Sequence, residues 1–443
     1  MTIIILFIAI FGLLLLIGWL KINPFVSLLF AAFFVGIANG MSLNKLIGSI
    51  NTGIGGTIGP LVLTLVFGMV LGTILSETGA VQQISSRLIK FFGEKYIKLA
   101  MVITGFSVGI AMFYNAGFLV LIPLVFAVAA KSGKPLVVIG IAVASGLSVT
   151  HCFLPPHPGP TALAVIFKAD IGKTLLYGIV AGIPALIVGG LIFPRFIKMI
   201  RPVGEQKFFA VQTFDENKLP GFGASFFIAV IPVLLMGFYA LSEIFMKADN
   251  PAGSVLKFLG DPGISLFIAS FLAIVILRKK SGAKLNVLMN KSFDSVSSVT
   301  LILLIIAAGG AFKQVLIDSG TSNYIAEYFK GSSIPPLFLA WMIAAFIRIA
   351  IGSATVAGLT AAGIVLPLVS SMHVSPELMV ISIGAGSVMC SHVNDSGFWM
   401  FKEYFGLSLK DTFRTWTAME SIMSVVGLAA ILLLNMVISE TGN

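Results

Sequence analysis

A polar segment, HCFLPPHPGP, interrupts a long apolar stretch of the chain at residues 151–160. Its four prolines remove amide donors and clash with the preceding turn, so no continuous helix can pass through it. The composition around Thr161 is typical of a helix start, whose free amides and positive dipole suit an anion. Histidine rings are charged or neutral near physiological pH, which makes this break a candidate binding site. Its predicted contacts are His151, Pro156, His157 and Thr161.

A second polar segment, CSHVNDSGFW at residues 390–399, interrupts a later apolar stretch. Asp395 is its most important charge, because an ionisable group deep in a bilayer is by default a functional-site hypothesis. Among the 18 acidic residues it is predicted to lie deepest, with Glu243 and Glu420 closer to the ends of spans. The neighbouring side chains are hydrogen-bonding and helix-capping types. The predicted contacts beside Asp395 are His392, Asn394 and Ser396.

Two more polar interruptions, FYNAG at 113–117 and GSATVAG at 352–358, lie near the middle of apolar stretches of more than thirty residues. They combine hydroxyls, an amide and glycines, which permit close backbone approach. Arg348 lies one turn before the second tip, and it could hold a carboxylate in a bidentate geometry that lysine cannot match. The predicted contacts at these tips are Tyr114, Asn115, Gly117, Ser353, Ala354 and Thr355.

Each of these features also has a purely structural interpretation. The prolines could simply kink two packed helices, and small residues at the tips could serve helix packing alone. Arg348 could pair with Asp395 or with hairpin carbonyls rather than with a ligand. A lone histidine is more often structural than functional, so His373 is assigned no role.

The elements that carry these segments are those of a membrane protein. Of the 443 residues, 58% are hydrophobic and 10% are charged, whereas soluble domains carry about 25% charged residues. Apolar runs of about 18 residues or more can cross about 30 Å of hydrocarbon. Cys152 and Cys390 offer neither a disulfide framework nor zinc spacing, and no metal or cofactor is predicted. The expected spans are 3–20, 24–40, 57–75, 136–167, 174–193, 223–246, 262–278, 299–317, 376–401 and 415–438.

The distribution of charge in the loops predicts how the spans are arranged. Lysine and arginine favour the cytoplasmic side of a membrane. The basic loops at 195–218 and 278–291 fall on that side only if residues 99–130 form a hairpin or two spans, rather than one. The same argument makes residues 337–371 a hairpin that enters from outside. The net charge of +10 is spread over such loops, which indicates topology rather than binding of nucleic acid.

The chain also repeats itself, because Pro135 and His151 recur as Pro376 and His392 with one offset of 241 residues. We therefore expect an all-α polytopic fold of about ten transmembrane helices and two re-entrant hairpins. The repeat is predicted to be inverted, with the site where the two broken spans meet. The expected organisation is N-terminal spans, mainly scaffold, at 1–98; a first repeat of hairpin and broken helix at 99–194; a cytoplasmic loop at 195–222; further spans, mainly scaffold, at 223–336; and a second such repeat at 337–443.

Three long motifs, HCFLPPHPGPTA, RIAIGSATVAGLTAAGIVLPL and SHVNDSGFWMFKEYFGLSLKDTF, closely resemble the gluconate permease family, proton symporters of the ion transporter superfamily. IGSINTGIGGTIG and GTILSETGA look like the same family, so the resemblance covers nearly the whole chain. It implies proton-driven uptake of gluconate or a related small sugar acid across the bacterial cytoplasmic (inner) membrane. Family members also transport fructuronate, idonate, glycerate or D-serine. The superfamily implies a scaffold and a mobile transport domain that work as an elevator, usually in a homodimer.

The first tip departs from the family pattern. It reads FYNAGF where the family usually reads FYEVGF or FFEVGF, so Asn115 stands where a titratable acid is expected. Asp395, His151 or His157 could carry the proton instead, or sodium could replace it. The asparagine could also hold position 115 in the shape of a neutral acid. Uptake of D-serine or another small hydroxy or amino acid is the alternative on the same fold.

Two rival functions come from other classes. A membrane-embedded metal hydrolase would need ligands in a metal-binding pattern, but the two histidines across the prolines lack i, i+4 helical spacing and an accompanying glutamate. A channel would need a continuous pore, whereas broken helices with opposed hairpins indicate an occluded site. The sequence therefore predicts a secondary transporter and no enzyme activity.

Overall fold

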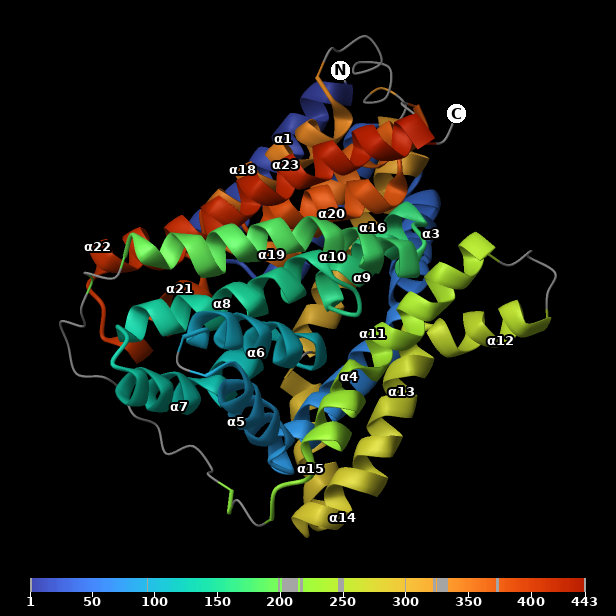
Figure 1. Ribbon diagram of the computed structural model, residues 1–443. Coiled ribbons are helices and arrows are strands. Elements are labelled where there is room, and N and C mark those ends of the chain that lie inside the picture. The colour runs from blue at the N-terminus through green and yellow to red at the C-terminus, as the bar shows by residue number, and fades with distance from the viewer. Residues whose placement is uncertain are drawn as a thin grey trace.

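The structure is a computed structural model that describes residues 2–93, 95–197, 200, 214–215, 218–245, 251–298, 300–321, 324, 334–371 and 374–441. Over these residues the regular elements are all helices (Figure 1). Most of the predicted loop at 195–222 and His373 lie outside the described residues. The helices long and apolar enough to cross a membrane are Leu43–Glu77, Leu136–Phe167, Ile171–Arg195, Phe222–Ser242, Pro262–Ser281, Leu285–Asp318 and Leu409–Ser439.

These seven helices and the all-helical architecture confirm the fold class at this level. Five shorter apolar helices accompany them in the described part of the chain, and they include both arms of the second predicted hairpin. The total of ten spans and the side from which the hairpins enter stay predictions.

The first helices differ from the expected spans in one place. The helices are α1 (Thr2–Leu14), α2 (Pro24–Ala38), α3 (Leu43–Ile58), α4 (Val62–Glu77) and α5 (Ala80–Phe92). The span expected at 57–75 is wrong at its start, because helix begins at Leu43, where the Ser42 side chain accepts a hydrogen bond from the Lys45 amide. The glycines and polar residues of this segment do not suggest a helix from sequence alone. The cap at Ser42 and packing on α16 (Thr300–Asp318) make it helical.

The first broken region follows directly. Its helices are α6 (Ile97–Ala111), α7 (Tyr114–Ser132), α8 (Leu136–Phe153), α9 (Pro158–Phe167) and α10 (Ile171–Leu186). The interruption between α6 and α7 and the break between α8 and α9 lie where the sequence predicts them. With 15 residues, α6 is about 22 Å long at 1.5 Å per residue, which is shorter than the hydrocarbon core.

The second half contains the same kinds of element. Its helices are α11 (Phe222–Phe245), α12 (Pro251–Gly260), α13 (Pro262–Leu272), α14 (Arg278–Ser281), α15 (Leu285–Ser298), α16, α18 (Pro336–Ile351), α19 (Ala354–Ser371), α20 (Pro376–Ser387), α21 (Ser396–Phe405), α22 (Leu409–Thr412) and α23 (Ala418–Thr441). The break between α20 and α21 confirms the second predicted interruption. Residues Phe413–Thr417 form a wide π-helical turn before α23.

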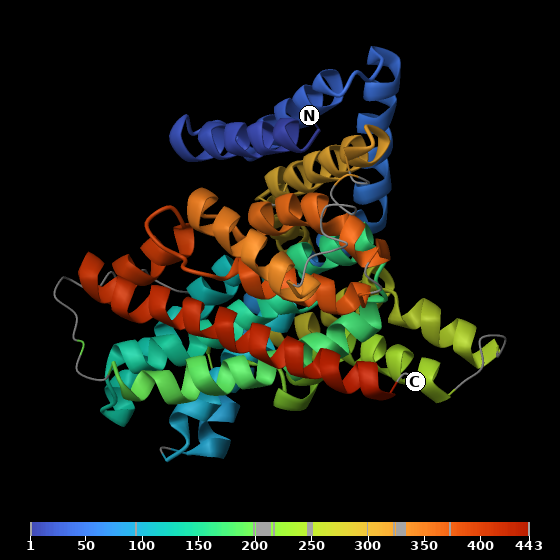
Figure 2. The same cartoon turned by 90° about the horizontal axis from the view of Figure 1, so that it is seen from above.

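The two halves pack in the same way. In the first half α6 lies on α8, and in the second α18 lies on α20. Likewise α3 packs on α16 as α15 packs on α4, and α2 packs on α16 as α13 packs on α4. Seen from above, α1 and α2 (blue) lie along one edge of the molecule (Figure 2). The internal repeat therefore extends beyond the two segments that the sequence predicts, into the N-terminal helices.

Candidate functional site

The end of α8, the second break and both tips line one cavity of about 350 Å³. That volume is within the range of small-molecule sites. The first tip contributes Tyr114 and Asn115, and α8 contributes His151. The second tip and second break complete the wall with the predicted residues Arg348, Ser353, Ala354, Thr355, Asn394, Asp395 and Ser396. The structure thus brings together residues that are up to 282 positions apart in the sequence.

Five predicted contacts do not line this cavity: Gly117, Pro156, His157, Thr161 and His392. Gly117 packs against α8, since a Cβ atom built there would lie 2.8 Å from a methyl of Leu147. Pro156 is buried within the first break. The other three make the contacts described next.

The first break is buried, and a histidine side chain connects it to α6. His157 is 3% exposed, and its Nε2 lies 2.6 Å from the carbonyl oxygen of Gly109 near the end of α6. This contact ties the start of α9 to the first tip. The Thr161 amide donates to the His157 carbonyl at 3.0 Å, and Pro158 and Pro160 have no amide hydrogen. The start of α9 therefore has few free amides, and the anion-binding role expected of amides near Thr161 stays a prediction.

The second break holds the end of α18. His392 Nε2 lies 2.9 Å from the Ile349 carbonyl, and Asn394 Nδ2 donates to the same oxygen at 2.8 Å. Gly352 ends α18 with φ +83°, and a Cβ atom there would collide with the backbone of Asn394. Only glycine accepts both that backbone angle and that contact. The second tip and the second break are thus joined at close range.

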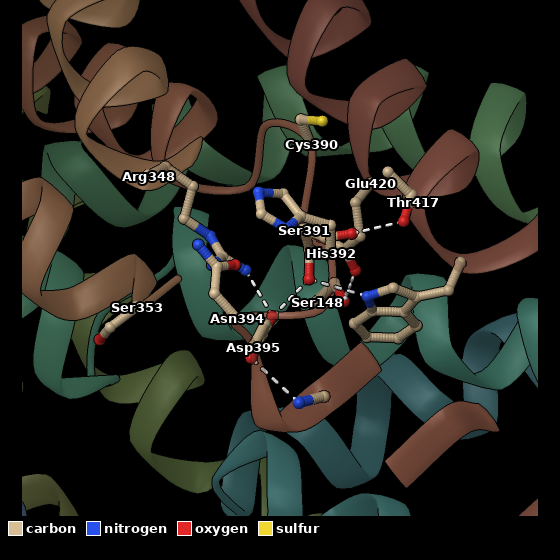
Figure 3. Close-up of polar contacts among 12 residues, drawn as sticks. Ser148, Arg348, Ser353, Cys390, Ser391, His392, Asn394, Asp395, Thr417 and Glu420 are labelled. Atoms are coloured by element: carbon tan, nitrogen blue, oxygen red, sulfur yellow. Dashed lines mark hydrogen bonds and ion pairs between the residues drawn. The ribbon is translucent and has the colours of Figure 1, made fainter. Parts of the chain in front are cut away.

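An ion pair lies at the centre of the second break (Figure 3). Arg348 Nη2 donates to Asp395 Oδ2 at 2.5 Å, and the two side chains are 4% and 17% exposed. Ser391 Oγ donates to the same oxygen, while the Gly397 amide donates to Oδ1 at 3.0 Å. Asp395 therefore caps α21 itself, beside the predicted contact Ser396. The pairing that the sequence left open for Arg348 does occur, through one nitrogen rather than in a bidentate geometry.

Polar atoms without partners gather in the cavity wall. Two nitrogens of Arg348, Nε and Nη1, are buried and have no hydrogen-bond partner. The Tyr114 hydroxyl, His151 Nδ1 and Asn394 Oδ1 share this condition. A buried polar group without a partner costs about 1–3 kcal/mol, so native structures rarely keep several in one place. Their clustering makes this cavity the candidate ligand-binding site.

Sequence reasoning missed Glu420, which it placed nearer a span end. Glu420 is 2% exposed, lines the cavity, and its Oε1 accepts a hydrogen bond from Ser148 Oγ at 2.5 Å. The π-helical turn before α23 brings Trp416 into the same wall, where its Nε1 donates to Ser391 Oγ at 2.8 Å. Such turns are frequent at functional sites. The signal was available, since Glu420 is the one charged residue of the span expected at 415–438.

The described part of the chain contains no group of three or more His, Cys, Asp or Glu side chains that could hold a metal ion.

Solved structures share this fold. The YdaH transporter of Alcanivorax borkumensis superposes with a TM-score of 0.68 at 16% identity, covering 97% of this chain and 99% of that one. MtrF of Neisseria gonorrhoeae gives a TM-score of 0.69 at 15% identity, covering 96% and 97%. At such identities the likeness concerns the fold alone.

Relatives of known sequence are much closer. The Gnt-II system L-idonate transporter of Escherichia coli is 47% identical, covering 96% of this chain and 97% of that protein. A high-affinity gluconate transporter of Escherichia coli is also 47% identical (99% and 100% covered), and the gluconate permease of Bacillus subtilis is 43% identical (99% and 100%). The profile of the GntP family permeases matches residues 1–437. The chain is therefore a multi-pass protein of the bacterial cytoplasmic membrane and belongs to the GntP family of permeases.

Proposed function

We propose that the protein is a secondary active transporter that takes up gluconate or a closely related small sugar acid, coupled to protons. The observation that carries this proposal is the set of partnerless polar atoms around one cavity, with the buried guanidinium of Arg348 among them. The names of the relatives, two of them gluconate transporters and one an L-idonate transporter, support the same substrate class.

Each kind of atom in a sugar acid has a counterpart in the wall. The carboxylate would bind Arg348, which offers Nη1 and Nε beside the nitrogen held by Asp395. The hydroxyls would bind the Tyr114 hydroxyl, His151 Nδ1 and Asn394 Oδ1, which together can donate and accept. Ser353, Thr355 and Asn115 lie in the same wall and would add further contacts. A site built to hydrogen-bond hydroxyls rejects analogues that lack them, because its buried polar atoms would then stay unpaired.

The proposal includes movement as an elevator in a homodimer. The second tip and second break would move as one body, since Gly352 and Asn394 touch and Asn394 holds the Ile349 carbonyl. Within this moving body Arg348 and Asp395 cancel each other's charge, which lowers the cost of carrying them through the hydrocarbon.

Uptake of radiolabelled gluconate into proteoliposomes tests the proposal, with and without an inward proton gradient. We expect saturable accumulation that the gradient drives, reduced by unlabelled L-idonate more than by D-serine. The variant Asn115→Glu shows whether an acid at the first tip adds to coupling. No accumulation of any small hydroxy acid under a proton or a sodium gradient contradicts the proposal, and flux that does not saturate favours a channel.

A further inference from the structure

Glu420 is the second carboxyl group in the cavity, and its surroundings differ from those of Asp395. Asp395 has a guanidinium, a hydroxyl and a backbone amide as donors. Glu420 has the Ser148 hydroxyl, and no ion pair joins it to a basic side chain within the described residues. It is also the more deeply buried residue, at 2% exposure. An ionised carboxyl group in such a place has no countercharge to offset its desolvation.

The groups that face Glu420 leave it as the side chain best placed to exchange a proton. These groups are Ser148, His151 and Cys152 on α8, Tyr114 on α7, Arg348 on α18, and Asp395 before α21. Arg348 stays charged under all physiological conditions, and the carboxyl group of Asp395 is already engaged by it in an ion pair. Tyrosine and cysteine ordinarily keep their protons at neutral pH. A protonated His151 would add a second positive charge with no acceptor at Nδ1.

The charge of the loaded cavity gives the reason for coupling. Arg348 and Asp395 cancel, so a bound sugar acid adds one uncompensated negative charge. An ionised Glu420 would add another in the same cavity, and Arg348 is the one arginine or lysine among the described residues of its wall. A proton on Glu420 removes that second charge. Binding of the anion and binding of the proton therefore favour each other, and the coupling acts equally in both directions.

We propose that Glu420 is the coupling residue of this transporter. Its carboxylate takes one proton from the outer solution as the sugar acid binds. When the sugar acid leaves on the inner side, the O–H bond breaks and the proton passes to the inner solution. This inference rests on the proposed function. One anion and one proton then cross together, so each cycle moves no net charge.

The test measures protons and gluconate binding in the same sample. Purified protein in weakly buffered detergent with a pH-indicating dye receives gluconate at a series of pH values on both sides of neutrality. The unmodified protein is expected to take up as much as one proton per gluconate bound. Glu420→Gln, which keeps an acceptor for Ser148, is expected to bind gluconate and take up none. The matched control is Glu403→Gln, because Glu403 is 41% exposed and pairs with Lys402 outside the cavity.

The outcomes separate the two proposals. If the unmodified protein binds no sugar acid, both fail. If it binds gluconate and Glu420→Gln takes up protons as the unmodified protein does, only the role of Glu420 is overturned.

A second variant guards against misfolding of Glu420→Gln. Ser148→Ala keeps the acid and removes its donor, so proton uptake should persist with its pH dependence displaced. An unchanged pH dependence would count against Glu420.

Discussion

The two breaks have similar places in the repeat but very different surroundings. At the first, Leu154, Pro155, Pro156 and His157 are all buried, and the histidine ring holds a backbone carbonyl. At the second, an ion pair lies beside the cavity and Val393 is 45% exposed. The first break is therefore enclosed by protein, whereas the second places a charged pair in the wall of the cavity. Equivalent interruptions of a helix need not have equivalent tasks.

The largest effect is expected from a substitution of Arg348, which pairs with Asp395 at the second break. Arg348→Lys keeps the positive charge but loses the planar guanidinium and its free nitrogens, so the sugar acid and Asp395 can no longer share it. We expect the binding free energy of the sugar acid to weaken by about 3 kcal/mol, as for a buried charge contact. This corresponds to about a 100-fold fall in gluconate uptake at low concentration. Arg195→Lys, at an exposed position, is the control and should transport normally. Normal uptake by Arg348→Lys would show that the carboxylate of the sugar acid does not depend on the Arg348 guanidinium.

The contact between the second tip and the second break can be isolated with a pair of glycines. Gly352→Ala places a methyl group against the backbone of Asn394 at φ +83°. Gly133→Ala has a similar angle, φ +64°, with nothing within 4 Å of the added atom. The free energy of unfolding of both variants should fall by about 1–2 kcal/mol, because alanine is strained at a left-handed backbone angle. Only Gly352→Ala should also lose uptake, by tenfold or more, and equal uptake by both would show that the tip does not need this contact.

The two histidines outside the cavity allow a direct test of the comparison. His157→Ala leaves the buried Gly109 carbonyl without its partner, which should lower the free energy of unfolding by about 2 kcal/mol. His392→Ala should cost less, because Asn394 Nδ2 still donates to the Ile349 carbonyl. Thermal unfolding in detergent measures both. A larger loss in His392→Ala would reverse the assignment of the two breaks.

The smallest expected effect concerns a single hydroxyl. Ser353→Ala should raise the KM for gluconate about fivefold, as expected for one neutral hydrogen bond worth about 1 kcal/mol. Its melting temperature should hardly change, since the Val356 amide lies at the long distance of 3.4 Å from this oxygen. Ser86→Ala, exposed on α5, provides the control. An unchanged KM would place Ser353 outside the ligand contacts.

The sequence predicts the helices and both breaks because these follow from local chemistry. Proline excludes a continuous helix wherever it occurs, and long apolar runs are unmistakable. The start of α3 at Leu43 was missed, since glycine-rich and polar segments become helical through tertiary packing rather than propensity.

Part of the cavity lining can also be predicted from local sequence chemistry. Residues at the breaks and tips could be found from composition, and ten of the predicted contacts line the cavity. The sequence could not show that His157 points away to Gly109, because that depends on the position of α6. The depth of Glu420 does not follow from its distance to the span end, because the turn that precedes it, Phe413–Thr417, is an irregular π-helical turn.

The shared packing of the two halves has a consequence for how this chain arose. Helices that keep the same neighbours in both halves have the form of one ancestral unit, duplicated and fused. After fusion, each copy is free to drift while the other preserves a working contact. His151 and His392, which recur 241 residues apart, now differ in this way. His151 lies in the cavity wall and its buried Nδ1 has no hydrogen-bond partner, whereas His392 contacts a carbonyl of α18. Histidines at matching places in the repeat therefore make different contacts within a single polypeptide.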